Sequence, residues 1–393
     1  MLKKIFRLMG QAIDMLGVKF ISLFYKNNEK YKDIWLISER GTEAKDNGYW
    51  MFKYIRENHP EINVHYIIDK SYKNDYEKVE KFSNIIEFKS LEHKIAFILS
   101  NRVISTHIGY VEPWSYKLYK MILDRTNKKK YIFLQHGVIY NDLSEYLNKS
   151  TTKIDKFITS TIGEYNSIAN TKEYGYYDGE VVQTGLARFD NLHNNKPKNQ
   201  ILLMPTWRKD ITNPSYAKDK GIDDSIFLNS KYYSVYSSLL NSEKLKNILI
   251  ENNIKLIFYP HYEIQQYVKY FNVNNDYIVI AKKEEYDVQQ LLMDSNLLVT
   301  DYSSVFFDFA YMKKPIIHYC FDKLNHYKTG YFDLEKDGFG KIISEEDELI
   351  NQISQYIENQ FSIEPNYEEK INDSFTVRDN KNCKRIYDVI KNI

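Results

Sequence analysis

Short apolar runs alternate with longer stretches of helical periodicity along almost the whole chain, and this alternation limits the folds open to it. Runs such as residues 297–300 have the length and composition of buried strands. Stretches such as residues 46–57 have the spacing of helices, here with Asp46 as a candidate N-cap. A strand, a helix and a second strand in sequence form a right-handed crossover between parallel strands. The sequence therefore predicts an α/β fold built on parallel sheets.

The predicted strands fall into two groups, separated by the polar, proline-containing segment 193–199, which is typical of a linker. The strands are expected at residues 34–38, 63–68, 102–106, 131–135, 156–159 and 181–184, and then at 200–204, 255–259, 277–280, 297–300 and 315–318. The helices expected after residue 200 are 231–251, 262–270, 286–293 and 304–312, followed by 345–359 and 378–391 on either side of a break at Pro365. We expect an N-terminal amphipathic helix over residues 1–32 and Rossmann-like domains over 33–194 and 195–393, with ligands bound between the carboxyl ends of the two sheets.

The composition excludes several classes of function. The chain has 393 residues, of which 43% are hydrophobic, enough for two globular domains. A formal net charge of +1 gives no field that favours nucleic acid, so no nucleic-acid partner is expected. Two cysteines cannot form a disulfide framework or a zinc site and fit a reducing cytoplasm. The sequence has no Gly-x-Gly-x-x-Gly or Walker-type loop and no cage of metal ligands, so no cofactor is implied, although a divalent cation is not excluded.

The first 32 residues combine apolar and basic side chains. The basic ones include Lys3, Lys4, Arg7, Lys19 and Lys26. Because Asp14 interrupts the apolar pattern, no cleavable signal peptide is expected, and no segment reaches the length of about 18 uncharged apolar residues typical of a membrane span. Two interpretations remain, a basic amphipathic helix on an anionic membrane face or a helix whose apolar side packs on the first domain. The one-sided positive charge favours the membrane.

Polar clusters follow four predicted strands, at the sheet edge where ligands bind in such folds. In the first cluster, Gln135-His136-Gly137, His136 is suited to general-base chemistry at neutral pH, and Gly137 permits a close backbone approach. The second ends in Arg208, whose planar fork of donors matches phosphate oxygens. The third ends in His261. Four such clusters at strand ends indicate a binding site.

The fourth cluster, Thr300-Asp-Tyr-Ser303-Ser304, joins a predicted strand to a predicted helix. The positive end of a helix and two serine hydroxyls favour a phosphate group. The alternative is that one serine only caps the helix. Because no Glu or Gln follows either serine by three residues, a capping box is missing, which favours the phosphate site.

Three carboxylates and one histidine near these clusters have alternative roles. Glu39 either faces the ligand cleft or pairs with Arg40 at the surface. Asp308 lies one helical turn after the second serine and either binds a ligand hydroxyl or stabilises the preceding turn, with the turn favoured. Asp301 is expected to brace the turn through Asx-type hydrogen bonds. His318 has apolar and aromatic neighbours and is expected in the core.

The clusters resemble the motifs of the CDP-glycerol:poly(glycerophosphate) glycerophosphotransferases, enzymes of wall teichoic acid and related capsule synthesis. The resemblance covers about residues 34 to 390 and rests on Ile37-Ser-Glu-Arg40, Asp46-Asn47-Gly48, Gln135-His136-Gly137, Met204-Pro-Thr-Trp-Arg208, Tyr259-Pro-His261, Thr300-Asp-Tyr-Ser-Ser-Val-Phe-Phe-Asp308 and Tyr327-Lys-Thr-Gly-Tyr-Phe-Asp333. One departure is Val138-Ile139-Tyr140-Asn141, where many members have Thr-Pro and then a lysine.

The resemblance implies a GT-B architecture, with the first domain on the acceptor side and the second binding a CDP-activated donor. It implies that His136 is the catalytic base and that His261 belongs to the catalytic residues as well. The donor diphosphate and polyol phosphate would lie at Arg208, His261, Ser303 and Ser304. Gly137, Glu39, Thr300 and Asp308 complete the residues expected to bind substrate.

The activity implied is transfer of a polyol phosphate, with glycerol favoured over ribitol, to a hydroxyl of a lipid-linked saccharide or growing polymer, with release of CMP. The expected place is the cytoplasmic face of the cell membrane, where the protein would be peripheral and contact an anionic surface. Two alternatives remain open, a GT-B glycosyltransferase or nucleotide-sugar epimerase, and a non-catalytic nucleotide-binding scaffold subunit.

Overall fold

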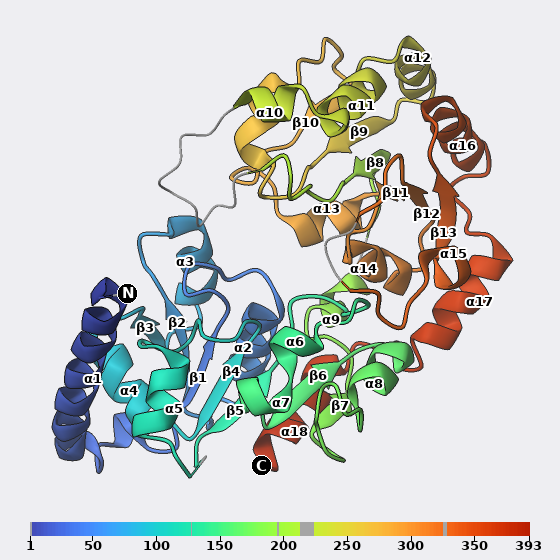
Figure 1. Cartoon of the computed structure of the whole chain (residues 1–393). Coiled ribbons are helices and arrows are strands. Elements are labelled where there is room, and N and C mark those ends of the chain that lie inside the picture. Colours follow the sequence, from blue (N-terminus) through green and yellow to red (C-terminus); the bar gives the residue numbers. More distant parts are fainter. Residues whose placement is uncertain (1, 127, 195, 213–223, 325–327) are drawn as a thin grey trace. The chain divides into compact units, whose positions relative to one another are not determined.

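The computed structural model describes residues 2–126, 128–194, 196–212, 224–324 and 328–393, which form two units, each built on one parallel sheet (Figure 1). The first unit comprises Met1–Val138, Leu143–Asp190 and Val377–Ile393. The second comprises Ile139–Asp142 and Asn191–Thr376. This confirms the predicted α/β class with two parallel-sheet halves.

The first unit contains a seven-stranded sheet in the order β3-β2-β1-β4-β5-β6-β7, with every neighbouring pair parallel. Its strands are β1 Trp35–Ser38, β2 Val64–Ile68, β3 Ile85–Glu87, β4 Arg102–Ser105, β5 Lys130–Phe133, β6 Lys156–Thr159 and β7 Val181–Gln183. Its helices are α1 Leu2–Ser22, α2 Asn47–Asn58, α3 Lys73–Glu80, α4 Leu91–Leu99, α5 Tyr116–Ile122, α6 Ser144–Leu147, α7 Lys149–Thr152, α8 Ile162–Ile168 and α18 Asn382–Lys391, with short 3-10 helices η1 Leu23–Tyr25 and η2 Glu29–Tyr31. The helix α9, Phe189–Leu192, lies where the chain passes to the second unit.

The second unit contains a six-stranded parallel sheet in the order β10-β9-β8-β11-β12-β13. Its strands are β8 Gln200–Leu203, β9 Lys255–Phe258, β10 Ile278–Ile280, β11 Leu297–Thr300, β12 Ile316–Tyr319 and β13 Gly340–Ile343. Its helices are α10 Asp224–Leu228, α11 Lys231–Leu240, α12 Glu243–Glu251, η3 Gln265–Tyr270, α13 Val288–Asp294, α14 Val305–Tyr311, α15 Leu334–Asp337, α16 Glu346–Glu358 and α17 Pro365–Ser374.

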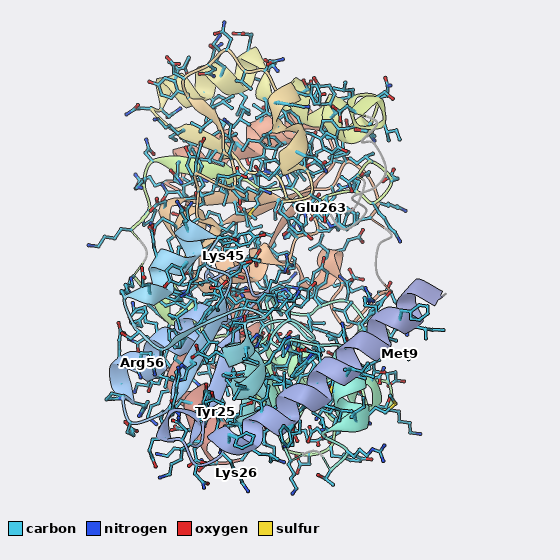
Figure 2. All side chains as sticks on the ribbon, turned by 90° about the vertical axis from the view of Figure 1, so that its left-hand side faces the viewer. Met9, Tyr25, Lys26, Lys45, Arg56 and Glu263 are labelled. Carbon is cyan, nitrogen blue, oxygen red and sulfur yellow. The ribbon has the colours of Figure 1, made fainter. Side chains whose placement is uncertain are left out.

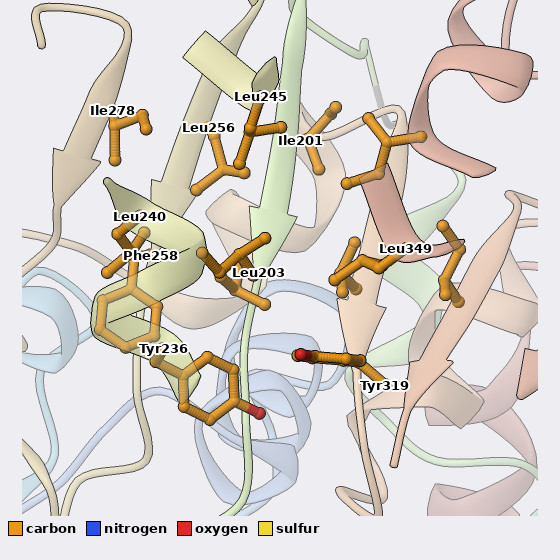
Figure 3. Packing of buried hydrophobic residues seen from close by; sticks show 14 of the residues in the cluster. Ile201, Leu203, Tyr236, Leu240, Leu245, Leu256, Phe258, Ile278, Tyr319 and Leu349 are labelled. Atoms are coloured by element: carbon orange, nitrogen blue, oxygen red, sulfur yellow. The ribbon is translucent and has the colours of Figure 1, made fainter. Parts of the chain in front are cut away.

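One face of the second sheet is covered by α11, α12 and α16, and their apolar side chains interdigitate with those of the strands (Figure 3). Alternate residues of β8 point to opposite faces, so Ile201 and Leu203 join this cluster, together with Leu256 and Phe258 of β9. From the helices, the cluster takes buried residues such as Tyr236, Leu240, Leu245 and Leu349. This packing fixes the ends of the strands, where the polar clusters lie.

The helix α1 packs on the first unit along one side only. Met15 and Val18 are buried, and Asp14 accepts a hydrogen bond from Trp114 Nε1 at 2.6 Å and pairs with Lys94 at 2.7 Å. The other side exposes a row of large apolar residues, Ile5, Phe6, Met9, Ile13, Leu16 and Phe20, and η1 adds the exposed Leu23 and Phe24. Figure 2 shows α1 on the outside of this unit, with Met9 towards one end and Tyr25 just past the other. Packing on the first domain, one of the two interpretations of this segment, therefore accounts for one side of the helix.

The two units differ from the expected division at 195 in two places. Residues 139–142 belong to the second unit, although the chain returns to the first at Leu143. The last helix, α18, belongs to the first unit, where it packs against α2 (red beside blue in Figure 1). The buried residues Ile386, Tyr387 and Ile390 provide its packing face, and Arg102 Nε of β4 donates to the Ile390 carbonyl at 2.9 Å.

Several local predictions need correction. The strands β3 and β13 were not expected. The helix predicted over 231–251 is divided at Asn241 and Ser242, because the Ser242 hydroxyl caps the next helix by accepting from Leu245 N–H. Pro365 opens α17 instead of marking a break, since the first turn of a helix tolerates proline. Residues 265–270 form a 3-10 helix.

Candidate functional site

His136 lies at the carboxyl edge of the first sheet, three residues after the last residue of β5, and its side chain is exposed. The preceding residue, Gln135, is buried and has a φ of 61°, in the left-handed region that non-glycine residues rarely adopt. Such strain persists only where the surroundings over-determine it and is common at functional sites. The structure therefore places His136 on a strained, firmly held turn.

The side chain of Gln135 is held by β6 and α8. Its Nε2 donates to the Ile158 carbonyl and to Glu164 Oε1, the latter at 3.0 Å. Glu164 is fully buried, and its other oxygen accepts from Ser160 N–H at 2.7 Å. These bonds satisfy Gln135 Nε2 and Glu164, whereas Gln135 Oε1 is buried without a hydrogen-bond partner among the described residues.

The backbone of the turn is held by a second network. The fully buried Asn47 donates to the Gln135 carbonyl at 2.8 Å and accepts from Arg188 N–H at 3.0 Å. The Arg188 guanidinium donates to the His136 carbonyl at 3.0 Å and pairs with Asp46 at 2.7 Å. Asn47 and Arg188 were not among the expected site residues. Asn47 lies within a family motif, whereas no local signal identified Arg188.

Glu39 is buried and holds the start of α2. Its carboxylate accepts N–H bonds from Lys45, Asp46 and Tyr49 at 2.8–3.0 Å. Burial raises the pKa of Glu39 to about 8, the charge of Asp46 adds to this, and the three N–H donors act in the opposite direction. A Cβ at Gly48 would lie 2.9 Å from Glu39 Cγ, so the glycine of this motif allows the Glu39 side chain to lie close to the α2 backbone. Burial therefore contradicts a surface pair with Arg40, while the role of Glu39 in substrate binding stays a prediction.

Four strands of the second unit, β8, β9, β11 and β12, bring their carboxyl ends to one edge of the sheet. Asp301, at the end of β11, is fully buried and accepts from Thr206 N–H at 2.8 Å and from Tyr302 N–H at 2.7 Å. The predicted brace is thus confirmed, and it extends to the loop after β8. His318 is fully buried, as expected, and its Nδ1 lies 3.0 Å from the Asp301 carbonyl.

Ser303 and Ser304 lie half-buried at the start of α14. Ser304 is the N-cap residue by position but makes no side-chain capping bond. In the described part of the chain, neither hydroxyl has a hydrogen-bond partner. The alternative that Ser304 merely caps the helix is therefore not supported, and the phosphate site at the two hydroxyls stays a prediction.

Arg208, after β8, is buried and paired with two carboxylates. It binds Asp322 bidentately at 2.7 and 2.8 Å, and its Nη1 lies 2.9 Å from Asp301 Oδ2. Burial lowers the pKa of Arg208, but the hydrogen bonds to Asp322 and the charge of Asp301 raise it above its ordinary value. Its charge is more than balanced by the two carboxylates. This geometry favours Arg208 as a brace between strand ends over a direct phosphate contact.

The three remaining site residues expected in the second unit are Thr300, Asp308 and His261, and each has different contacts. The Thr300 hydroxyl donates to the Met204 carbonyl at 2.7 Å, linking β11 to the end of β8. Asp308 is buried in α14. His261 is half-buried after β9, and its ring stacks with Trp207 at a centroid distance of 6.1 Å and lies 4.4 Å from the Tyr262 ring. Of these, His261 keeps a surface position at the edge that carries the serines.

The segment 139–142 packs beside the same turn within the second unit. The Tyr140 hydroxyl donates to the Tyr302 carbonyl, and its ring lies 5.6 Å from Phe306. Asp142 forms an antiparallel bridge and an ion pair with Lys328. A Cβ at Gly330 would lie 2.2 Å from the Tyr140 carbonyl oxygen, which explains the glycine of the 327–333 motif. Tyr327 itself lies outside the described residues.

A cavity of about 630 Å³ lies at the same edge of the second unit. It is lined by the loops after β8 and β12 and by the start of α11, through Arg208, Lys209, Asp210, Lys231, Asp322 and Lys323 among others. Four of these side chains are basic and two are acidic, so the lining suits an anionic ligand.

Comparisons with known proteins agree with this picture. The family model of the CDP-glycerol:poly(glycerophosphate) glycerophosphotransferases matches residues 19–392. The minor teichoic acid biosynthesis protein GgaB of Bacillus subtilis is 37% identical over 91% of this chain and 40% of its own length. A teichoic acid poly(glycerol phosphate) polymerase of the same species is 24% identical over 90% of this chain and 48% of its own length. The chain therefore spans less than half the length of these two relatives.

Solved structures show the same fold. The wall teichoic acid polymerase TagF has a TM-score of 0.68 at 18% identity, over 98% of this chain and 97% of that one. A UDP-N-acetylglucosamine 2-epimerase has a TM-score of 0.54 at 11% identity, over 91% of this chain and 95% of that one. At these identities the likeness establishes two parallel-sheet α/β units of the GT-B-like kind.

Proposed function

Because this chain belongs to the CDP-glycerol:poly(glycerophosphate) glycerophosphotransferase family, we propose that it transfers glycerol phosphate from CDP-glycerol to a hydroxyl of a lipid-linked saccharide or growing polymer. The observation that carries the proposal is the setting of His136. Its ring is exposed at the carboxyl edge of the first sheet, while its backbone is fixed by a strained neighbour and by Arg188. A general base needs this combination of access and fixed position.

In the proposed reaction, the acceptor hydroxyl oxygen attacks the phosphorus that carries the glycerol. A new P–O bond forms, the bond from that phosphorus to the bridging oxygen breaks, and CMP leaves with the bridging oxygen. His136 takes the proton of the acceptor hydroxyl. Charge then spreads over the diphosphate, and donors fixed in advance stabilise it.

The second unit supplies those donors. The hydroxyls of Ser303 and Ser304, together with His261, form the donor-binding set, while Gly137 leaves space for the substrate beside the base. Arg208, Thr300 and Asp308 act by holding the β11–α14 turn in place. The ion pairs of the buried Arg208 with the buried Asp301 and the half-buried Asp322 support this division of roles.

The donor is tested by incubating the protein with a lipid-linked acceptor and, in turn, CDP-glycerol, CDP-ribitol and a panel of UDP-sugars. Release of CMP from CDP-glycerol is the expected result. UDP release or an epimerised sugar would identify a glycosyltransferase or epimerase instead. Absence of turnover with every donor would favour a non-catalytic scaffold subunit.

The exposed side of α1 fits the cytoplasmic face of an anionic membrane. The stretch Ile5–Tyr25 is long and apolar enough to cross a bilayer by length and composition, with a mean hydropathy of 1.2. However, Gln11 accepts from Ser115 N–H at 3.0 Å, and Met15 and Val18 are buried against the unit. These contacts support a helix that lies on the membrane, since a spanning helix would have to break them. Exposed Arg7 and Lys19 would each add about 1 kcal/mol at an anionic surface.

Substitution tests this better than deletion, because deletion would also remove Met15 and Val18 from the core. The triple variant Ile13→Asn, Leu16→Asn and Phe20→Ser changes only exposed side chains. It is expected to lose co-sedimentation with phosphatidylglycerol vesicles while keeping the affinity for CDP-glycerol. The control variant Tyr177→Ser removes an exposed ring elsewhere on the unit. Equal vesicle binding by the triple variant and the wild type would refute the membrane role of α1.

A further inference from the structure

A second histidine, His107, lies beside His136 at the carboxyl edge of the first sheet. It follows β4, the strand next to β5, and is half-buried. The two imidazole rings are stacked, with centroids 4.6 Å apart and planes inclined by 13°. No part of the proposed reaction uses His107, and it was not an expected site residue.

The contacts of His107 determine its tautomer. Arg40 Nε donates to His107 Nε2 at 3.2 Å. Because a guanidinium group has no acceptor, Nε2 must present its lone pair. The ring proton is then on Nδ1, which lies 2.8 Å from the Thr106 hydroxyl oxygen. His107 is therefore held as a neutral imidazole, with neither ring nitrogen available as a base.

The backbone of His107 is fixed as well. The Ser105 hydroxyl donates to the His107 carbonyl at 2.6 Å and accepts from its N–H at 3.1 Å. The Tyr110 ring packs against the His107 ring in an edge-to-face arrangement, with centroids 5.7 Å apart. Ring and backbone are thus fixed independently of His136, and His107 forms a rigid surface against which the exposed His136 ring rests.

The surroundings of the pair lower the pKa of both rings, and they keep His107 in its neutral form. Burial lowers the pKa of His107 to about 2, and the charges of His136 and Arg40 act in the same direction. Desolvation by the surrounding protein is the main cause that lowers the pKa of His136, and the charges of Arg40 and Arg188 lower it further. The charge of Asp46 and a hydrogen bond with the Thr106 backbone raise it. Glu43 lies 3.9 Å from Arg40 Nε and also pairs with Lys45 at 3.6 Å.

We propose that His107 is a positioning residue for His136, held neutral by Arg40 so that its stacked ring orients the base and leaves it free to accept the proton. A charged ring at this distance would oppose protonation of His136. The role in catalysis rests on the proposed function of His136, whereas the arrangement of the two rings does not.

Imidazole ¹⁵N spectra of the 393-residue chain, labelled at its nine histidines, test the arrangement directly. Variants at each of the two positions assign the resonances. His107 is expected to show the Nδ1–H tautomer and to remain neutral across about pH 5 to 9. In Arg40→Met the Nε2 lone pair is released, so His107 is expected to titrate and the two rings to protonate in coupled steps. An Nε2–H tautomer in the wild type, or an unchanged His107 in Arg40→Met, would overturn the proposal.

Turnover of CDP-glycerol tests the positioning role. His107→Ala is expected to lower kcat by up to about 100-fold with little change in KM, because the base loses its fixed orientation. His107→Phe keeps a flat neutral ring and is expected to restore most of kcat, which a purely structural role of the imidazole hydrogen bonds would not allow. Unchanged kcat in His107→Ala would refute positioning. Full activity of His136→Ala would instead refute the base assignment, and the spectra would still decide whether the ring pair exists.

Discussion

The carboxyl edges of the two sheets use charged residues in opposite ways. At the first edge, the carboxylates of Glu39 and Asp46 hold backbone and Arg188 in place, and a titratable ring, His136, reaches solvent. At the second edge, Arg208 is buried between two carboxylates, and uncharged serine hydroxyls are left open. The first edge is thus built to present a base, and the second to present neutral hydrogen-bond donors on a turn braced by internal ion pairs.

This difference has a physical reason. A base must change its charge during the reaction, so it needs access and a moderate field around it. A group that binds a diphosphate needs a fixed shape, and fixed dipoles provide it without reorganisation. The Arg208 ion pairs cost desolvation, but they set the positions of the loops after β8, β11 and β12 together.

The largest expected effect comes from removing the exposed base. His136→Ala is expected to lower turnover of CDP-glycerol by about 10²–10⁴-fold, with little change in KM. His59→Ala is a suitable control, because His59 lies at the far end of α2 and stacks on Tyr387. Steady-state rates of CMP release measure both. Near-normal kcat in His136→Ala would show that the first edge does not present the base.

Removing the Arg208 ion pairs of the second edge is expected mainly to lower the free energy of unfolding. Arg208→Met leaves Asp301 and Asp322 without their cation and is expected to cost about 3–5 kcal/mol in the free energy of unfolding. Lys246→Met, which removes an exposed pair with Glu243, is the control and is expected to cost under about 1 kcal/mol. Urea unfolding measures both. If Arg208→Met keeps wild-type stability but loses CDP-glycerol affinity, Arg208 contacts the donor directly.

Acid is expected to weaken both units through buried histidines. Burial lowers the pKa of His93 in the first unit to about 3 and that of His318 in the second to about 4, from an ordinary value of 6.5. The unfolded chain therefore binds more protons below pH 6.5, and stability falls as the pH drops towards these values, by up to about 1.4 kcal/mol per pH unit for each histidine.

Urea unfolding at a series of pH values measures this dependence. His93→Gln and His318→Gln cannot titrate, so each variant should flatten the acid side of the curve, even where its stability at neutral pH is lower. A slope that stays the same in both variants would show that other groups dominate acid unfolding.

The smallest expected effect tests the turn that carries the serines. Tyr140→Phe removes the hydroxyl that donates to the Tyr302 carbonyl but keeps the ring against Phe306. One hydrogen bond contributes about 1 kcal/mol, so we expect KM for CDP-glycerol to rise by about fivefold, with kcat nearly unchanged. Tyr146→Phe, at an exposed position, serves as the control. A fall in kcat without a change in KM would indicate that Tyr140 acts with the base of the first edge and not in donor binding.

Much of the fold was readable because a parallel sheet buries both faces of its strands. The strand β11, for example, is buried along its whole length and begins with three apolar residues, and the polar residues that follow it mark the carboxyl edge. The strand β13 was missed because it contains Gly340 and the exposed Lys341. Gly340 is required there, since a Cβ would lie 2.0 Å from the Ile316 carbonyl oxygen. The short length of β3 does not explain why it was missed, since β7 and β10 also have three residues and were predicted.

The sequence by itself determined the α/β class, the two groups of strands, the brace at Asp301 and the motif residues at strand ends, because these depend on local periodicity and on residue type. Only the tertiary structure decided that α18 joins the first unit, that Arg208 is paired with Asp301 and Asp322, and that His107 stacks on His136. Each of these depends on the distance between residues far apart in the chain. Packing sets such distances, and no local pattern records them.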